Sequence, residues 1–543
     1  MRRTLCALLA LTLLLSMLSG CAKVDMSWFT DKFKSSSDTE DAADSTAAET
    51  PQQETTAVVT EVLSELESFG LAYQPDYGLH PYNCESLNNR IIFSFIYEPL
   101  FAVTQELDAV PVLAKDYTVS EDGTETTITI QSGVRFHNGQ ALTAQDVVYS
   151  LTASRNTAYY GNRLRDVSEI TATADDTIVL VTSVAYGDLP LLLDIPIIPD
   201  GSAEEASPPG TGPYSLDGTE RLVRNSDWWQ DGPPLVDYDE ITLTPVTTTA
   251  EIRDNFEYEN INMVLTDPNS AAYAGFHNDY ELWEDGTTIL QYIGYNIGSH
   301  VFSNYGLRSA ITYAIDRDTI VSELMGGFAT AVTLPCQPGS KYYDAKLALK
   351  YGYSMENFYR QLESASVEDM DHDGRLDLYV SSLGYAVPVS GTMIVCASSY
   401  QRVQAATKIV QDLNALGFDI TLKSMDYDEY HSALLNGNFD LYYGEVRLSP
   451  NFDLSPFFQY NGNLNYGSLA DSTMQSLCNR MLVNSGNAYS LYQRLCDRGY
   501  LTPVMFKNYA VYTTRGAVTE PTRYIDWFLP APETVSDESA PNA

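Results

Sequence analysis

The residues best suited to catalysis are few and scattered. The six histidines are not spaced as a metal-binding pair, and the sequence has no nucleophile elbow, phosphate-binding loop or dinucleotide-binding fingerprint. His137 stands beside an Asn138-Gly139 turn signal and is interpreted as structural. A catalytic triad can assemble from distant positions, so these absences do not exclude an enzyme. They leave no positive evidence for one, and we predict a protein that is not an enzyme.

One acidic run has the spacing of a metal loop. Asp369, Asp371, Asp373 and Asp377 occupy positions 1, 3, 5 and 9 of an EF-hand calcium loop, with a glycine at position 6. Position 12, where such a loop carries a bidentate Glu, is Val380. The alternative is an acidic turn exposed to solvent. A structural calcium ion held by these four aspartates is therefore an open expectation, and no other cofactor is predicted.

The cysteines indicate neither a redox motif nor a zinc site. There is no C-x-x-C, and five cysteines lie beyond the N-terminal segment: Cys84, Cys336, Cys396, Cys478 and Cys496. An odd number leaves at least one thiol unpaired. Cys478 and Cys496 fall on two successive helical patterns, so a disulfide between them and two free thiols are both open.

Composition excludes several classes of protein. The 543 residues are 44% hydrophobic, which excludes a disordered chain and suits two or three domains. With 31 Lys and Arg against 72 Asp and Glu, the net charge is −41. Such a surface repels phosphate backbones, so we predict that the protein does not bind nucleic acid.

The N-terminus has the pattern of an export signal. Arg2 and Arg3 precede a mostly apolar run over residues 5–18, which is too short to span a bilayer comfortably. The run ends in Leu18-Ser-Gly-Cys21, which resembles the bacterial lipobox. We predict a signal peptide over 1–20, lipidation of Cys21 and a disordered acidic tether over 21–61. An ordinary signal peptide with an incidental cysteine is the alternative.

The body of the chain has mixed periodicity. Asp122-Gly123 between alternating runs predicts a hairpin over 117–130. Thr143 with Asp146 predicts the start of a helix, and this helix runs through Leu151. The alternation of helix and strand over 403–443 indicates an α/β domain. The predicted elements are strands at 69–73, 418–422 and 439–443 and helices at 88–101, 403–416 and 427–435.

Several runs, in order, resemble family 5 of the extracellular solute-binding proteins, the oligopeptide-, dipeptide- and nickel-binding components of ABC importers. These runs are Glu98-Pro-Leu100, Phe136-His-Asn-Gly139, Thr143-Ala-Gln-Asp-Val147, Gly210-Thr-Gly-Pro-Tyr214, Asn225-Ser-Asp-Trp-Trp229, Leu307-Arg-Ser-Ala310, Ala314-Ile-Asp-Arg317 and Gly437-Asn-Phe-Asp440. The resemblance covers about residues 65–515.

The resemblance implies an α/β, two-lobed, periplasmic-binding-protein-like fold (type II, cluster C) with an extra β-rich inserted domain. Mapped on this chain, lobe I comprises 62–88, 187–295 and 501–530. The inserted domain is 89–186, lobe II is 296–500, and 531–543 form a flexible tail.

The resemblance also places the ligand site. His80-Pro81 begins a stretch like one that carries contact residues in the family, which makes Glu85 a candidate partner for a ligand amine; a surface carboxylate is the alternative. Tyr159 and Tyr160 fall where the family often has an aromatic residue at the cleft edge, although both could be core residues. The further candidates are Tyr443, Glu445, Arg447 and Asp453.

The run after Phe439-Asp440 departs from the family pattern. Val446 and Ser449 stand where members usually have a tryptophan and an amine-binding aspartate. Glu445 and Arg447, on one face of a strand, could bind a zwitterion or a ligand carboxylate, or pair with each other. This departure puts a standard oligopeptide specificity in doubt.

The implied function is that of a lipid-anchored receptor on the extracytoplasmic face of a bacterial membrane. It would act as a monomer that touches the membrane through its anchor alone. It would close two hinged lobes on a solute, with a peptide favoured, and deliver it to an ABC permease and ATPase. The alternatives are a ligand sensor or surface interaction protein on the same fold, or a binder of a nickel chelate or an oligosaccharide.

Overall fold

The computed structural model describes residues 66, 68–232, 234–268, 276–518, 522–524 and 527–529. The signal peptide, Cys21, the acidic tether and the tail predicted above lie outside these residues. Within the described ranges, no helix combines the length and the apolar composition needed to cross a membrane.

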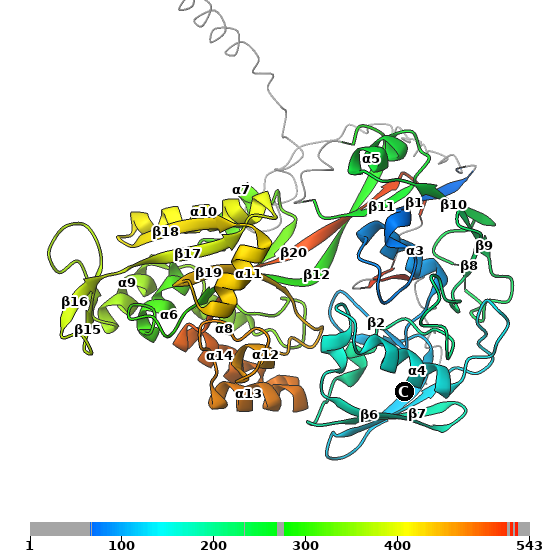
Figure 1. Cartoon of the computed structure of the whole chain (residues 1–543), viewed down its shortest axis with the longest axis horizontal. Coiled ribbons are helices and arrows are strands. Elements are labelled where there is room, and N and C mark those ends of the chain that lie inside the picture. The colour runs from blue at the N-terminus through cyan, green and yellow to red at the C-terminus, as the bar shows by residue number, and fades with distance from the viewer. Residues whose placement is uncertain are drawn as a thin grey trace, which may run out of the picture. The chain divides into compact units, whose positions relative to one another are not determined.

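One large sheet runs through the described chain (Figure 1). Its strand order is β18 (Asp419–Met425), β17 (Ser390–Cys396), β19 (Leu441–Arg447), β12 (Tyr280–Tyr295), β20 (Leu501–Thr514), β11 (Met263–Thr266), β1 (Phe69–Tyr73), β10 (Glu240–Pro245), β9 (Arg221–Arg224) and β8 (Tyr214–Asp217), and β13 (Ala329–Ala331) pairs with β20. β17 is parallel to both β18 and β19, which confirms the α/β unit predicted over 403–443.

Two long strands join the two ends of this sheet. The last part of β12, residues 289–295, pairs with β19, whereas its first part, residues 280–286, pairs with the end of β20 that borders β11 (Figure 1). The register between β12 and β20 shifts between Gly286 and Leu290. Such a break in the ladder lets strands bend and twist locally, and it lies where the two parts of the sheet meet.

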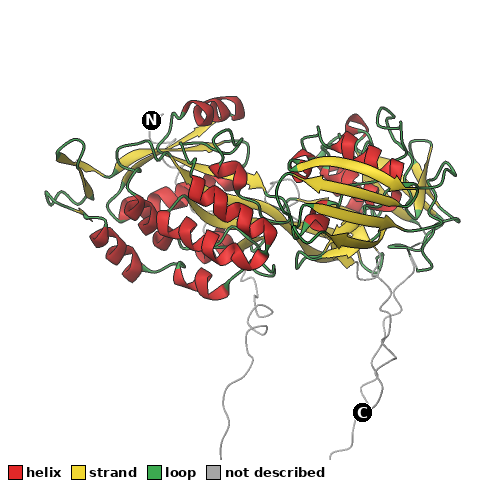
Figure 2. Cartoon of the chain, turned by 90° about the horizontal axis from the view of Figure 1, so that it is seen from below, coloured by secondary structure: helices red, strands yellow, loops and turns green. Residues whose placement is uncertain are grey.

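The remaining strands form smaller sheets. A four-stranded antiparallel sheet, seen face-on in Figure 2, carries α4 (Ala144–Ser154) on one face. Its order is β4 (Ala114–Val119), β5 (Glu125–Ile130), β7 (Thr177–Thr182) and β6 (Val167–Ala174). The others are β14 (Val367–Glu368), β15 (Asp377–Val380) and β16 (Tyr385–Pro388); β2 (Phe101–Val103) and β3 (Ala109–Pro111); and β21 (Thr522–Tyr524) and β22 (Trp527–Leu529).

Local sequence signals set where the helices begin. Thr143 N–H donates to Asp146 at 2.8 Å, which confirms the predicted start of α4. Ser86 and Ser399 accept bonds from the first turns of α3 (Leu87–Ile96) and α10 (Tyr400–Ala415). The helices are α3 (Leu87–Ile96), α4, α5 (Thr249–Glu257), α6 (Tyr305–Ala314), α7 (Arg317–Leu324), α8 (Ala345–Lys350), α9 (Met355–Ser364), α10 (Tyr400–Ala415), α11 (Tyr427–Asn436), α12 (Ser455–Phe458), α13 (Ser472–Val483) and α14 (Ala488–Arg498), with short 3-10 turns at η2 (Pro75–Tyr77), η3 (Gly161–Leu164), η4 (Leu189–Leu192) and η5 (Ser485–Asn487).

One expectation needs revision, and one alternative that the sequence left open is decided. The helix predicted over 88–101 ends at Ile96, because Pro99 lacks an N–H and restricts Glu98 to extended backbone, and Phe101 begins β2. Cys478 and Cys496 are both free, buried thiols. They lie on α13 and α14. Cys496 is about one helical turn farther from the segment that connects the two helices than Cys478 is, so the two thiols lie at different heights along the helix pair.

The apolar side chains form two principal cores. One includes Phe302, Ile394 and Leu491 and packs the helices around β17–β19. The other includes Phe95 and Leu180 and packs the four-stranded sheet with α3 and α4. β12 and β20 therefore connect two separately packed bodies.

Candidate functional site

A cavity of about 620 Å³ has walls from both bodies. One wall comes from the segment before α3, from α3 itself and from the segment between α4 and η3. The other wall is the end of β19 and the residues after it. The lining residues are 82–85, Arg90, 158–159, 162–163 and 445–449.

Two helix caps position the residues of this site. The Ser86 hydroxyl accepts from Asn89 N–H, which starts α3 directly after Glu85 and places Arg90 in its early turns. The Ser399 hydroxyl accepts from Arg402 N–H and so holds Arg402 in the first turn of α10. Both caps replace hydrogen bonds that a helix N-terminus otherwise lacks.

Three guanidinium groups surround the ring of Tyr159. The Cζ atoms of Arg90, Arg447 and Arg163 lie 3.6, 5.2 and 5.7 Å from its centroid. Such distances favour cation–π attraction. Arg447 belongs to β19 of one body, whereas Tyr159 belongs to the other, so the ring and Arg447 meet across the cavity.

The arginines are also held by polar contacts. Arg163 forms an ion pair with the fully buried Asp194. Arg90 Nη2 donates to Tyr160 Oη at 3.1 Å, and Arg447 Nη2 donates to Tyr509 Oη at 3.2 Å. These contacts fix the orientation of the guanidinium groups at the cavity wall.

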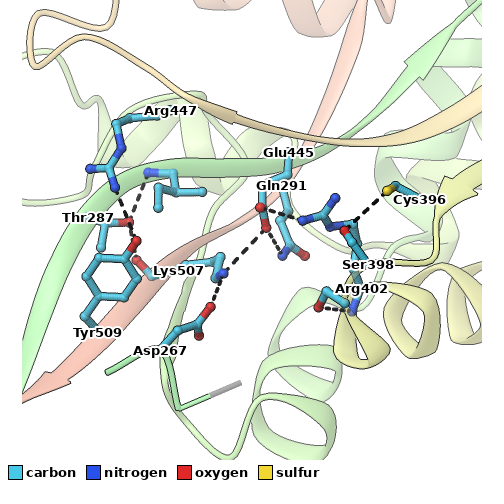
Figure 3. Close-up of polar contacts among 12 residues, drawn as sticks. Asp267, Thr287, Gln291, Cys396, Ser398, Arg402, Glu445, Arg447, Lys507 and Tyr509 are labelled. Atoms are coloured by element: carbon cyan, nitrogen blue, oxygen red, sulfur yellow. Dashed lines mark hydrogen bonds and ion pairs between the residues drawn. The ribbon is translucent and has the colours of Figure 1, made fainter. Parts of the chain in front are cut away.

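Glu445 lies in a network of donors (Figure 3). Its carboxylate accepts from Arg402 at 2.6 Å and from Gln291 at 2.8 Å, and lies 3.7 Å from Lys507 Nζ. Lys507 also pairs with Asp267. Burial alone lowers the pKa of Lys507, but Glu445 and Asp267 outweigh it, and the pKa is raised.

This network settles one alternative left open by the sequence. Among the described residues, Glu445 pairs with Arg402 and Lys507 and not with Arg447. Arg402 and Lys507 are 43 residues before and 62 residues after Glu445, so no local pattern pointed to either.

The other predicted site residues fall in different places. Glu85 is exposed at the cavity, beside Cys84, whose thiol pKa is raised by burial. Tyr160 and Tyr443 are buried at 1% and 0% exposure and lie behind the lining. Asp453 is buried, accepts from Ser455 N–H and forms a 2.5 Å ion pair with Arg165, outside the lining residues.

The acidic loop lies apart from this cavity. Carboxylate oxygens of Asp369, Asp371 and Asp373 lie within 4.8 Å of one another, whereas Asp377 is buried in β15 and accepts from Met370 N–H. Several of the loop's carboxylate oxygens accept backbone N–H bonds, as in a tight polar turn. The structural calcium ion stays a prediction.

His137 has a structural contact. Its Nε2 lies 3.0 Å from the carbonyl oxygen of Gly212, and burial lowers its pKa.

The sequence did not single out Arg90 and Arg163. A signal for Arg90 was nevertheless present, because a charged residue within the apolar run of α3 is rarely buried without a specific partner.

The described chain has the fold of two-lobed periplasmic binding proteins. An oligopeptide-binding protein of Bacillus subtilis, solved with a nonapeptide, matches with a TM-score of 0.57 at 20% identity over 82% of this chain and 94% of that one. NikA of Brucella suis, solved with Fe(III)-EDTA, matches with a TM-score of 0.67 at 18% identity over 84% and 98%.

The sequence comparison is more specific. A family model described as bacterial extracellular solute-binding proteins, family 5 Middle, matches residues 108–468, and the chain belongs to that family. It is a binding protein, not an enzyme. Glutathione-binding proteins of Salmonella paratyphi A and Escherichia coli O157:H7 are 27% and 26% identical to it over 282 residues, which are 49% of this chain and 55% of each relative. The chain thus spans about half the length of the curated relatives it matches.

Proposed function

We propose that this protein captures a short peptide in the cavity between its two bodies and delivers it to an ABC permease. The observation that carries the proposal is the cavity itself, whose walls come from the two packed bodies that β12 and β20 connect. Bending at the register shift near Gly286 would close the walls on a ligand.

The cavity's size and charge suit a short peptide. Its volume of about 620 Å³ lies in the usual range for small-molecule sites. It offers the Glu85 carboxylate for an amine and guanidinium groups for a carboxylate. Relatives described as binding glutathione, which is a tripeptide, and a neighbour solved with a nonapeptide support the same ligand class.

The location and partners are part of the same proposal. A signal peptide over 1–20 and a lipid on Cys21 would tether the monomer to the outer face of the cell membrane through residues 21–61. Family membership supports an extracytoplasmic location and a permease and ATPase as partners. The two separate cores support two packed bodies, and the finer division into lobe I, inserted domain and lobe II is part of the proposal.

Native mass spectrometry tests the capture step. The mature chain from residue 21, carrying Cys21→Ser to prevent lipidation, is purified without refolding. We expect a heterogeneous set of bound masses that denaturation releases and that fragment as peptides. Glu85→Ala should reduce their occupancy, whereas Glu204→Ala, at an exposed site outside the cavity lining, should not.

Two other results would redirect the proposal. A single discrete non-peptide mass would assign a dedicated ligand such as a metal chelate. A cavity without bound mass, together with no thermal shift on addition of peptide pools, would refute peptide capture.

A further inference from the structure

Two ion pairs join the two bodies outside the cavity lining. Arg165 Nη2 lies 2.5 Å from Asp453 Oδ2, and Lys341 Nζ lies 2.6 Å from Asp188 Oδ1. Tyr342 Oη also donates to Asp188 at 2.8 Å. All five residues lie outside the set that lines the cavity. These contacts therefore hold one body to the other without requiring a ligand.

The first pair joins the continuations of the two cavity walls. Arg165 follows the lining residue Arg163 by two positions. On the other wall, Phe452 N–H donates to the carbonyl oxygen of the lining residue Ser449 at 2.8 Å, and this turn leads directly to Asp453. The ion pair thus closes the space between the walls beside the cavity.

The second pair connects the same two bodies. Asp188 directly precedes Leu189, which packs in the core of the four-stranded sheet, whereas Tyr342 packs in the core around β17–β19. The ring centroid of Tyr342 lies 5.8 Å from that of Phe452, edge to face. This ring contact links the two pairs within one body, so we expect them to form and break together.

A close backbone approach accompanies the ion pairs. Gly187 N–H donates to the carbonyl oxygen of Leu482 at 2.8 Å. A Cβ atom at Gly187 would lie 2.7 Å from the carbonyl oxygen of Val483, the last residue of α13. That distance is too short for a side chain, so the bodies approach this closely because the residue is glycine.

We infer that Arg165 with Asp453, and Asp188 with Lys341 and Tyr342, form a clasp that stabilises the closed cavity independently of the ligand. The inference rests on the proposed function and deepens it. A ligand that selects the closed form binds more tightly when more of the free protein is already closed. The clasp residues are positioning residues, which raise the affinity for all ligands alike and do not choose among them.

Pulsed electron paramagnetic resonance measures closure directly. Spin labels are attached at Glu169→Cys on β6 and Thr473→Cys on α13, both exposed, in the mature Cys21→Ser chain, whose five native thiols are buried. Bound solutes are first removed by reversible unfolding. We expect the parent chain to be mainly closed, and Asp453→Asn to lower the ratio of closed to open molecules about tenfold, as loss of a charge-assisted contact predicts. Lys408→Gln, which removes an ion pair within α10, should leave the ratio unchanged.

A second variant opens the clasp without removing a charge. Gly187→Ala should also favour the open form, whereas Gly232→Ala, with open space around it, should not. Asp453→Asn does not leave Arg165 without an ionic partner, because Asp166 remains 2.9 Å away. If Asp453→Asn nevertheless fails to fold, Gly187→Ala decides.

Charge reversal distinguishes the clasp from a general contribution to stability. Asp188→Lys should open the chain by placing two cations together, and the addition of Lys341→Asp should restore the closed population. High salt should shift the parent chain toward the open form, because these pairs are partly exposed. A double variant that stays as open as Asp188→Lys alone contradicts the assigned pair.

Calorimetric titration with tri-alanine separates the clasp from the proposed function. For a clasp that acts only through closure, the apparent Kd rises by the factor by which the closed fraction falls. A parent chain that is mainly open, or equal distance distributions in the parent chain, Asp453→Asn and Gly187→Ala, overturns the clasp and leaves peptide capture standing. A Kd that stays constant while the closed fraction falls overturns its role in affinity. A change in distances without any tri-alanine binding retains the clasp and counts against peptide capture.

Discussion

Glu98 should make the stability of this protein depend on pH near neutrality. The carboxylate is 1% exposed and accepts from four donors: Thr211, Trp228, Trp229 and Gln230. Burial raises its pKa from 4.5 to about 7, and these hydrogen bonds offset only part of that shift. Between pH 4.5 and about 7, Glu98 therefore retains a proton in the folded protein that it has released in the unfolded chain.

The sign and size of the effect follow from this difference. Protonation of Glu98 contributes stability that is fully present below pH 4.5 and is lost as pH rises through about 7. A difference of about 2.5 pKa units corresponds to about 3 kcal/mol. We expect the free energy of unfolding, relative to Glu98→Gln, to fall by this amount between pH 4.5 and 8.

Urea unfolding at constant ionic strength measures the effect. Subtracting the Glu98→Gln curve cancels the titration of the many other acidic groups. A difference that stays flat, or that rises with pH, would refute the reasoning and show that the four donors hold Glu98 ionised. If Glu98→Gln does not fold, native tryptophan fluorescence of the parent chain gives an independent readout. Trp228 and Trp229 contact the carboxylate, so their emission should change with a midpoint near pH 7.

Three further predictions concern packing, thiols and metal. Gly294→Ala should lower the free energy of unfolding by about 1–3 kcal/mol, because its Cβ would lie 2.1 Å from the ring of Tyr442. Gly232→Ala, with open space around it, should change the free energy of unfolding little. Chemical denaturation compares the two variants, and equal effects would contradict the packing. The mature Cys21→Ser chain should show no fast-reacting thiol when folded and five when unfolded in a thiol-reagent assay, and fewer than five would indicate a disulfide. Millimolar calcium should raise the melting temperature if the loop at 369–377 binds it, and Asp371→Asn should remove the shift; no shift in the parent chain rejects the metal site.

The parts of the fold that sequence predicted well are those made by neighbouring residues. The Asp122-Gly123 turn joins β4 and β5, and the capping box of α4 spans the four residues 143–146, so each signal is contained in the segment that it organises. The helix predicted over 88–101 failed where a local rule was overlooked. Pro99 ends the helical backbone even though the apolar pattern continues past it.

The site was less accessible to sequence because its contacts join distant segments. Glu85, Glu445 and Arg447 were placed on the cavity through family resemblance, whereas Arg90 was missed. Its contact with Tyr159 spans 69 residues, and the approach of Arg447 to the same ring spans 288. No periodicity within one segment encodes such a meeting, since it depends on how the two bodies pack around β12 and β20.

Glu445 and Arg447 show why residue type and spacing alone misjudge a binding strand. They lie two positions apart on β19, but the carboxylate of Glu445 is matched by Arg402 and Lys507, which attach β19 to α10 and to the crossing strand β20. Removing Glu445 would thus leave Arg402 without this carboxylate, whereas Lys507 would keep Asp267, and the attachment of β19 to α10 would weaken. Arg447 approaches Tyr159 from across the cavity. Arg447 therefore lines the cavity, and the charge of Glu445 holds the strand that presents it.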